Sequence, residues 1–306
     1  MSEKGRIIKG VGGLYEVRLE SGETVTCTAS GIFRYDNTTV AVGDHVTIKI
    51  EPDGSAAIKS IIERRNILIR PPLANLDILF IVVAAASPDP DLTTADKLIS
   101  IAEFNMIEPV VIITKFDLDT EKARYISEIY RKSGFYTFIG TEGLMGFITD
   151  HAGGKTSAFA GASGAGKTTL LNKLFPVRLA LNTGELSRKT ARGKHTTRHV
   201  QLYPLAELLP NAPNSLTGYL ADTPGFSLLD FERYNFYSKE DLPFTFREFE
   251  QYLTKCKFTK CTHTKEEGCA VIEAVRNGLI PAERHNSFLE IYDGIKDKRA
   301  WTKYPK

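Results

Sequence analysis

The first sixty residues alternate apolar and polar positions in short runs, which is the pattern of half-buried β-strands. Glycine, aspartate and serine residues separate the runs and supply the turn chemistry of hairpins. The predicted strands are Arg6–Lys9, Leu14–Leu19, Thr24–Ala29, His45–Ile50 and Ala57–Ile62. Five short strands in succession predict an OB-fold barrel, a fold that often binds oligonucleotides. The alternative is that the barrel is a purely structural appendage that binds no nucleic acid.

The pattern changes after Arg70-Pro71-Pro72, which we interpret as a linker. Leu76–Ala86 is an apolar run typical of a buried strand, and helical stretches follow at Asp96–Phe104 and Glu121–Gly134. Strands that alternate with helices predict an α/β domain with a mostly parallel sheet. Within this domain Pro204–Leu216 is rich in proline and is predicted to be a surface excursion.

Beyond Tyr234 the sequence becomes helical and charged, and it ends in an amphipathic stretch, Pro281–Lys298. A chain of 306 residues exceeds a typical single domain. We therefore predict a multidomain protein with a β-barrel in residues 1–68, an α/β domain in residues 69–236 and a mainly helical unit in residues 237–306.

The composition, 42% hydrophobic and 25% charged, is that of an ordinary globular protein. A net charge of +2 is too small to indicate a polyanionic partner by itself. The longest apolar run is far shorter than the roughly 20 residues of a membrane-spanning helix. The N-terminus also lacks the pattern of a secretory signal. We expect a cytoplasmic, monomeric protein without a membrane partner.

A glycine-rich loop stands between a predicted strand, Thr156–Ala160, and a predicted helix, Thr169–Phe175. It matches G-x-x-x-x-G-K-[ST], in which backbone N–H groups converge on phosphate oxygens at a helix N-terminus. Lys167 would neutralise the outer phosphates in a binding and catalytic role, and the Thr168 hydroxyl would ligate Mg²⁺. The residues predicted to contact the nucleotide here are Gly161, Ala162, Ser163, Gly164, Ala165, Gly166, Lys167, Thr168 and Thr169.

Another apolar strand ends in Thr114-Lys115-Phe116-Asp117, close to the N-K-x-D by which GTPases recognise guanine. The Asp117 carboxylate can accept two hydrogen bonds, from the guanine N1–H and amino group, whereas adenine would leave it partly unpaired. Lys115 would lie across the base. Thr114 replaces the usual asparagine, whose amide ties this loop to its surroundings, so we expect weaker affinity with retained selectivity.

A third motif, Asp222-Thr223-Pro224-Gly225, follows the phosphate loop at the end of a further strand. In this D-x-x-G pattern Asp222 would lie near Mg²⁺ and the Gly225 amide near the γ-phosphate. In ordinary GTPases the guanine motif follows the phosphate loop and the D-x-x-G motif, but here it precedes both. The order predicts a circularly permuted GTPase domain, because termini can move to surface loops while the sheet stays intact.

Three of the four cysteines lie close together with a histidine. The spacing Cys256-x₄-Cys261-x-His263-x₅-Cys269 supplies four ligands, enough to enclose one structural Zn²⁺ with no open position for catalysis. Neighbouring lysines would favour thiolates and could touch RNA phosphates. Surface thiols without a metal are the alternative.

The leading barrel, the three nucleotide motifs and the terminal Cys/His cluster stand in the order of the RsgA family, also called YjeQ, which the chain resembles over nearly its whole length. Lys194-His195-Thr196-Thr197 adds to the match. The resemblance implies hydrolysis of GTP to GDP, stimulated by the small ribosomal subunit during its late maturation, with the barrel on ribosomal RNA. It places the last guanine-contacting loop near Phe138–Gly143, where Ile139-Gly140-Thr141 matches poorly.

The segment Arg188–His199 carries five Lys or Arg residues between the phosphate loop and the D-x-x-G motif. A GTPase has a mobile switch at this place, so we expect the segment to become ordered on GTP and RNA. Either Thr196 or Thr197 would then approach Mg²⁺. A solvated basic loop is the alternative.

Phe226 follows Gly225 where many GTPases carry a glutamine that orients the attacking water. A phenyl ring can neither donate to nor accept from this water, so hydrolysis should be slow until the small subunit stimulates it. The family pattern makes His195 the candidate catalytic residue in place of the glutamine.

Two other functions would share parts of this pattern. An ATP-using P-loop enzyme would have the same phosphate loop, and Asp117 argues against it. A non-enzymatic RNA-binding scaffold with a decayed nucleotide site would explain Thr114, whereas the intact phosphate loop and Asp222 oppose it.

Overall fold

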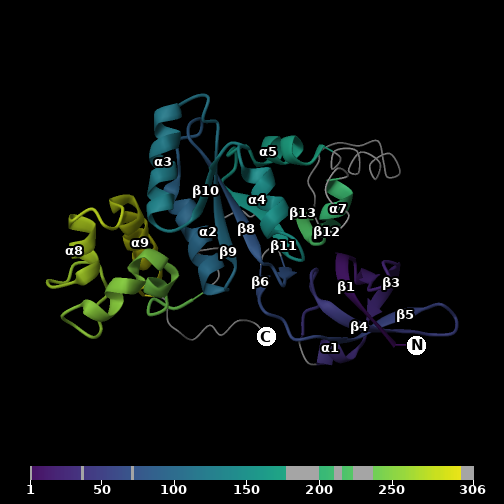
Figure 1. Ribbon diagram of the computed structural model, residues 1–306. Coiled ribbons are helices and arrows are strands. Elements are labelled where there is room, and N and C mark those ends of the chain that lie inside the picture. Colours follow the sequence, from purple (N-terminus) through teal and green to yellow (C-terminus); the bar gives the residue numbers. More distant parts are fainter. Residues whose placement is uncertain are drawn as a thin grey trace.

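The computed structural model describes residues 2–35, 38–69, 72–176, 200–209, 216–222 and 237–297. A β-barrel, a central α/β domain and a helical C-terminal unit follow one another along the molecule, so that the barrel and the C-terminal unit lie at opposite ends (Figure 1).

The N-terminal barrel is closed by five strands, and short apolar side chains at alternate positions fill it. Its strands are β1 (Ser2–Val11), β2 (Leu14–Leu19), β3 (Thr24–Ala29), β4 (His45–Ile50) and β5 (Ala56–Ile61). Strand β1 pairs with both β2 and β4, and β3 pairs with β5, which completes the ring. The interior residues are Ile7, Val17, Val46, Ile48 and Ile58, all fully buried. The predicted five-stranded barrel is confirmed.

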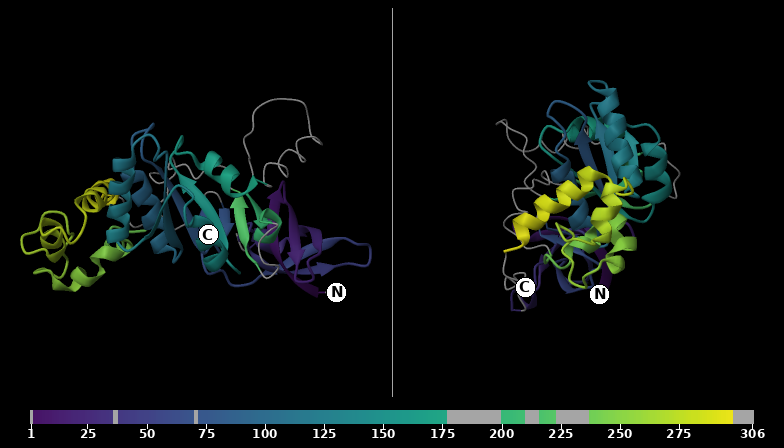
Figure 2. Two further views of the ribbon diagram at one scale, coloured as in Figure 1. Left: turned by 45° about the horizontal axis from the view of Figure 1, so that its top comes forward. Right: turned by 90° about the vertical axis from the view of Figure 1, so that its left-hand side faces the viewer.

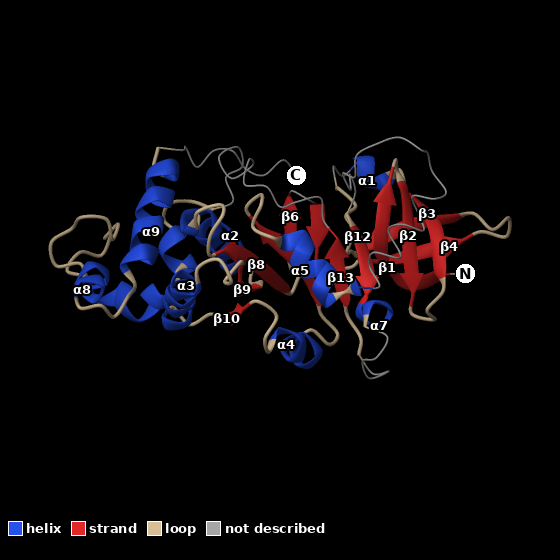
Figure 3. Cartoon of the chain, turned by 90° about the horizontal axis from the view of Figure 1, so that it is seen from above, coloured by secondary structure: helices blue, strands red, loops and turns tan. Residues whose placement is uncertain are grey.

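The central domain contains a parallel sheet with the strand order β10-β9-β8-β11-β13. These strands are β8 (Ile78–Ala84), β9 (Glu108–Thr114), β10 (Tyr136–Ile139), β11 (Thr156–Gly161) and β13 (Tyr219–Asp222). Strand β12 (Gln201–Pro204) runs antiparallel beside β13 and also pairs with β1 at Lys9. The barrel therefore continues the central sheet, as the run of red strands in Figure 3 shows.

Helices cover both faces of the central sheet. On β8, Leu79, Ile81 and Val83 face the core that includes α2 (Leu92–Phe104) and α3 (Thr120–Lys132). The intervening residues of β8 face α4 (Leu144–His151) and α5 (Lys167–Leu174). Because successive side chains of a strand point to opposite faces, a strand buried on both sides must be apolar at every position, which explains the unbroken apolar run.

Two proline-containing stretches differ from their predictions. Pro72 opens a short strand, β7 (Pro72–Ala74), which pairs with β6 (Ile67–Ile69), so it is not part of a linker, and Arg70 and Pro71 lie outside the described residues. Pro204 ends β12, and the next four residues form α7 (Leu205–Leu208), whose Leu205 and Leu208 are fully buried. The prediction of a surface excursion was wrong for these residues, because a proline without a backbone N–H fits both the end of a strand and the position before a helix.

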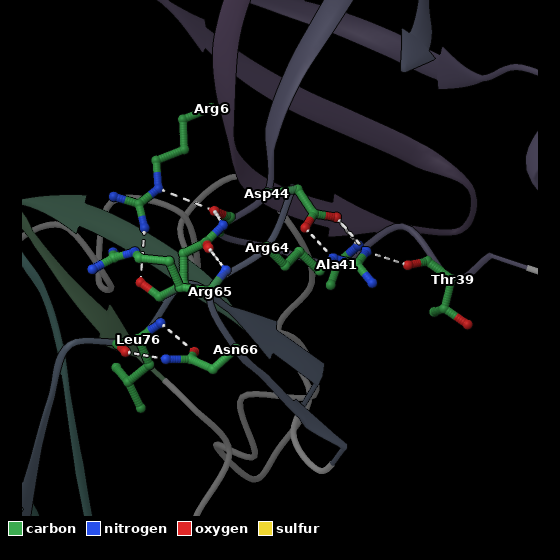
Figure 4. A network of polar contacts seen from close by, with 10 residues as sticks. Arg6, Thr39, Ala41, Asp44, Arg64, Arg65, Asn66 and Leu76 are labelled. Atoms are coloured by element: carbon green, nitrogen blue, oxygen red, sulfur yellow. Dashed lines mark hydrogen bonds and ion pairs between the residues drawn. The ribbon is translucent and has the colours of Figure 1, made fainter. Parts of the chain in front are cut away.

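Polar contacts hold the barrel against the central domain. A network around Arg6, Arg64 and Asn66 joins the barrel to the segment that leads into β8 (Figure 4). The buried Arg6 guanidinium of β1 donates to the Gly43 carbonyl oxygen at 3.3 Å, and also to the Thr156 hydroxyl at the start of β11. The Thr156 N–H in turn donates to a carboxylate oxygen of Asp77 at 2.8 Å, and Arg65 donates to the other oxygen of Asp77. Barrel and nucleotide domain are thus joined by buried hydrogen bonds as well as by strand pairing.

The C-terminal unit packs on α2 of the central domain, away from the barrel (Figure 2). It contains the 3₁₀ segments η2 (Leu242–Thr245) and η3 (Arg247–Lys255) and the helices α8 (Ala270–Arg276) and α9 (Ala282–Ile295). The fully buried Arg284 of α9 pairs with Asp96 of α2 at 2.5 Å and with Glu248 at 2.6 Å. No helix in the described ranges has the length and apolarity needed to span a bilayer.

Candidate functional site

The predicted nucleotide motifs meet at one edge of the central sheet. Strand β9 ends at Thr114, β11 at Gly161 and β13 at Asp222. The carboxyl ends of parallel strands share one edge, which is where α/β proteins bind their ligands. The guanine motif comes first in the chain, yet the fold brings it beside the phosphate loop. The motif order is that of a circularly permuted GTPase domain.

Two glycines give the phosphate loop its path. Gly161 has a φ of 145°, and a Cβ there would lie 2.3 Å from the Val82 carbonyl oxygen. Gly166 has a φ of 84° and directly precedes α5, so the loop leads into the N-terminus of this helix. Only glycine adopts such conformations at low cost and allows the backbone to approach a phosphate closely. The loop therefore has the geometry expected of a phosphate cradle.

Lys167 begins α5 and turns back across this loop. Its ammonium donates to the carbonyl oxygens of Gly161 and Ala162, both at 2.7 Å. Burial lowers the pKa of Lys167. Phosphate oxygens beside the ammonium would offset this desolvation, since an opposite charge favours the charged form. Thr168 and Thr169 follow in the first turn of α5 and are exposed.

Thr114 joins the guanine motif to the phosphate loop. Its buried hydroxyl lies 2.5 Å from the Ala165 carbonyl oxygen and 3.3 Å from that of Val83, and it donates to them. The loop therefore keeps a connection to its surroundings without the asparagine, because the shorter hydroxyl makes it, and the expected weaker affinity stays a prediction. The same observation removes one argument for a decayed nucleotide site.

We predict that Thr114→Val lowers the affinity for GDP about 5- to 100-fold, since a buried carbonyl left without its donor costs about 1–3 kcal/mol. Valine keeps the branched shape but not the hydroxyl. Thr114→Ser, which keeps the hydroxyl, serves as the control and should bind within about threefold of wild type. Titration with a fluorescent GDP analogue measures both variants. Unchanged affinity in the valine variant would show that the hydrogen bond has no role in binding.

The remaining residues of the guanine motif lie on the turn after β9. Asp117 is exposed there, as a residue that meets a base must be. Lys115 has a positive φ of 54°, and its ammonium donates to the Ser87 carbonyl oxygen. The ring of Phe116 lies against Gly140, where a Cβ would approach it to 2.6 Å. The loop around Gly140 thus lies beside the guanine motif, as the resemblance implied.

A cavity of about 380 Å³ opens between the phosphate loop and the segment that precedes α2. Its lining includes Pro88, Asp89, Asp91 and Thr94 from that segment, and Ala162 from the loop. Neither Ser87 nor the residues that line the cavity from the segment before α2 were predicted from the sequence. Their position along the chain was the only indication that they belong to the site. Ser87 follows the buried strand β8, which neighbours the phosphate-loop strand in the parallel sheet.

Several predicted site residues lie outside the described part of the chain. They are Gly225, His195, Thr196 and Thr197, together with Phe226 and the basic segment 188–199. Asp222 is the last described residue of its motif; it is buried and stands opposite Gln201 in the pairing of β12 with β13.

The predicted zinc ligands come together in the C-terminal unit. The ligand atoms of Cys256, Cys261, His263 and Cys269 all lie within 4.8 Å of one another. The sulfurs of Cys256 and Cys269 are 3.9 Å apart, and they lie 3.6 and 3.4 Å from Nδ1 of His263. A tetrahedral Zn²⁺ with usual bond lengths would separate sulfur from sulfur by about 3.8 Å and sulfur from nitrogen by about 3.5 Å. The donor set fits a tetrahedral metal ion.

Burial sets the protonation of these ligands. It lowers the pKa of His263, which favours the neutral imidazole that binds metals. It raises the pKa of Cys261 to about 12 and also raises that of Cys269. Desolvation thus acts against the thiolates, and the expected influence of the neighbouring lysines stays a prediction. Metal binding must therefore displace thiol protons.

Two side chains hold the loop that carries these ligands. The Glu266 carboxylate accepts from the backbone N–H groups of Thr262 at 2.6 Å and Thr264 at 3.0 Å. Nε2 of the buried His285 lies 2.8 Å from the His263 carbonyl oxygen, to which it donates. The ligand positions are therefore fixed by the fold, in an arrangement that could bind a metal ion.

Comparisons with known proteins agree with this architecture. The RsgA GTPase profile matches residues 61–232, and the RsgA N-terminal domain profile matches residues 4–58. A protein of Caldanaerobacter subterraneus subsp. tengcongensis, named small ribosomal subunit biogenesis GTPase RsgA, is 39% identical over 300 residues, which are 96% of each chain. A protein of the same name from Bacillus subtilis is 37% identical over 97% of this chain and 98% of its own.

Solved structures give the same result. The crystal structure of YloQ, described as a circularly permuted GTPase, matches with a TM-score of 0.75 and 34% identity over 98% of this chain and 96% of that one. YjeQ from Thermotoga maritima matches with a TM-score of 0.77 and 30% identity over 98% of this chain and all of that one. With these matches over nearly its full length, the chain belongs to the RsgA family of circularly permuted GTPases.

Proposed function

We propose that this protein hydrolyses GTP to GDP and phosphate during late maturation of the small ribosomal subunit, and that the subunit stimulates it. The observation that carries the nucleotide part is the contact between a guanine motif and a phosphate loop through the Thr114 hydroxyl. The subunit part rests on the names of the relatives and on a closed barrel of a kind that often binds oligonucleotides.

In this proposal each motif has one task. Asp117 and Lys115 select guanine, the loop from Gly161 to Thr169 and the Gly225 amide hold the phosphates, and Lys167 offsets their charge. Bound Mg²⁺ would neutralise charge that develops on the γ-phosphate. Its proposed ligands are Thr168, Asp222 and either Thr196 or Thr197. One Zn²⁺ on Cys256, Cys261, His263 and Cys269 would stabilise the C-terminal unit.

The proposed boundaries place the RNA-binding barrel in residues 1–68, the GTPase domain in 69–236 and the zinc unit in 237–306. We further propose that the protein acts as a monomer in the cytoplasm. Its partners would be GTP, GDP and the small subunit with its ribosomal RNA.

Competition binding tests the base preference. Labelled GDP bound to the protein should be displaced by unlabelled GTP, and ATP should need a concentration at least about 10³-fold higher, because a site built to hydrogen-bond one base leaves its carboxylate unpaired in the complex with the other. Efficient displacement by ATP would favour an ATP-using P-loop enzyme instead.

We predict that His195→Ala keeps the affinity for GTP and for small subunits but loses about 10²-fold or more of the stimulated turnover, since a residue that positions or activates water acts mainly in the transition state. His199→Ala, in the same basic segment, is the matched control. Phosphate release at saturating subunit measures both. Full stimulation of the His195 variant would remove His195 from the mechanism.

A further inference from the structure

The C-terminal unit has an open pocket on its surface, beside the metal cluster. Its volume is about 490 Å³, and its lining comes from the turn before η2, from η2 and η3, from the ligand loop and from α9. Phe244 and Phe258 stand at this pocket with 74% and 50% of their surface exposed. Leu253 and Tyr292, both half-buried, add further apolar surface. Two exposed phenyl rings beside one pocket mark a binding surface, because single-chain folds seldom leave such surface uncovered.

The charges around the pocket are mainly positive on the side of the ligand loop. Residues 255–265 include four lysines and no acidic residue. Of these, Lys260 lines the pocket, and the Lys257 ammonium lies 5.6 Å from the centre of the Phe258 ring. On the opposite wall Lys239 donates to the Lys296 carbonyl oxygen at 3.2 Å. Cations beside exposed aromatic rings are the combination that single-stranded nucleic acids require, since bases stack on the rings and phosphates meet the lysines.

One carboxylate, Glu240, also lines the pocket. It would repel a phosphate, but it can accept a hydrogen bond from the amino group of a base. The hydroxyls of Thr259 and Thr262 offer further polar contacts on the same lining. The aromatic rings and the carboxylate therefore suit the base, whereas the lysines of the ligand loop suit the backbone.

We propose that this pocket binds an unpaired base of single-stranded RNA, stacked on Phe244 and Phe258, with Lys260 and Lys257 on the adjoining phosphates. The proposal rests on the proposed function, which supplies an RNA partner. It adds a base-reading contact at the end of the molecule opposite the barrel (Figure 1). The metal ligands Cys261 and His263 border the pocket and shape it through the loop they hold.

Ultraviolet cross-linking tests the proposal on the full chain with its metal bound. The probe is a short single-stranded RNA of mixed sequence, and the cross-linked peptides are identified by mass spectrometry. We expect wild type to cross-link at residues 239–262. The double variant Phe244→Ala, Phe258→Ala should lose about tenfold or more of this cross-link, in line with the energy of base stacking. Phe244→Trp, which keeps an aromatic face, should retain it.

Leu279→Ala is the matched control, because Leu279 is a large exposed apolar residue of the same unit that does not line the pocket. It should cross-link as wild type does. No cross-link in this region of wild type, or an equal one in the double variant, would overturn the proposal. Weaker binding of small subunits by the double variant without any RNA cross-link would assign the pocket to a protein segment and also overturn it. Wild-type GTP hydrolysis with small subunits is measured in parallel, so a failure of the proposed function is seen separately.

Discussion

Asp117→Asn is expected to convert the nucleotide preference from guanine to xanthine. The carboxylate accepts from the guanine N1–H and amino group, whereas an amide accepts from N1–H and donates to the C2 carbonyl oxygen of xanthine. For guanine the amide keeps only a neutral bond from N1–H and sets its own N–H against the guanine amino group, so the affinity for GTP should fall about 10²- to 10⁴-fold. Because Asp117 is exposed on a turn, the fold should be unaffected.

Competition between GTP and XTP for a labelled nucleotide measures this change. Asp119→Asn is the matched control, because Asp119 is a neighbouring exposed carboxylate whose side chain caps α3, and asparagine caps a helix equally well. The control should keep the guanine preference. An Asp117 variant that still prefers GTP to XTP would show that another residue reads the base.

Removing one metal ligand should release the metal and unfold much of the C-terminal unit. Wild type is expected to hold about one Zn²⁺ per chain, and Cys261→Ser should lose most of it, because structural zinc contributes about 10–16 kcal/mol to the folding of small metal domains. The unit has few long helices of its own, and the ligand loop connects η3 to α8. Elemental analysis and thermal unfolding measure the two effects.

Cys27→Ala provides the control, since Cys27 is buried in the barrel and lies outside the cluster. It should leave the metal content unchanged. Because burial raises the pKa of Cys261 and Cys269, protons compete with the metal, and metal content should fall as the pH is lowered. A metal-free Cys261 variant with the unfolding curve of wild type would contradict a structural role.

The sequence predicted elements whose pattern is local. The barrel strands alternate with a period of two and are separated by turn residues, and β8 is apolar on both faces, so their positions followed from the pattern alone. The phosphate loop could be placed for the same reason, since its glycines and Lys167 are adjacent in sequence. Cys256, Cys261, His263 and Cys269 also lie close together in the chain, and the fold confirms that they converge.

Features that depend on distant contacts could not be predicted. The Thr114 hydroxyl finds its partner at Ala165, far along the chain, so the substitution of asparagine looked like a loss. Leu205 and Leu208 are buried only because α7 packs beneath the sheet, although Pro204 suggested a loop. The amphipathic pattern of Pro281–Lys298 did not indicate that Arg284 is buried, because its burial requires the carboxylates of Asp96 and Glu248 from two other elements.

Phosphate release from GTP, measured with and without purified small ribosomal subunits, tests the central claim most directly. We predict slow release by the protein alone and a rise of about 10²-fold or more with subunits, as expected when a partner completes a site that lacks its water-orienting group. ATP should give no stimulated release under the same conditions. Absence of GTP turnover in both conditions would contradict the account and would favour a non-enzymatic scaffold, and rapid turnover without subunits would contradict the proposed stimulation.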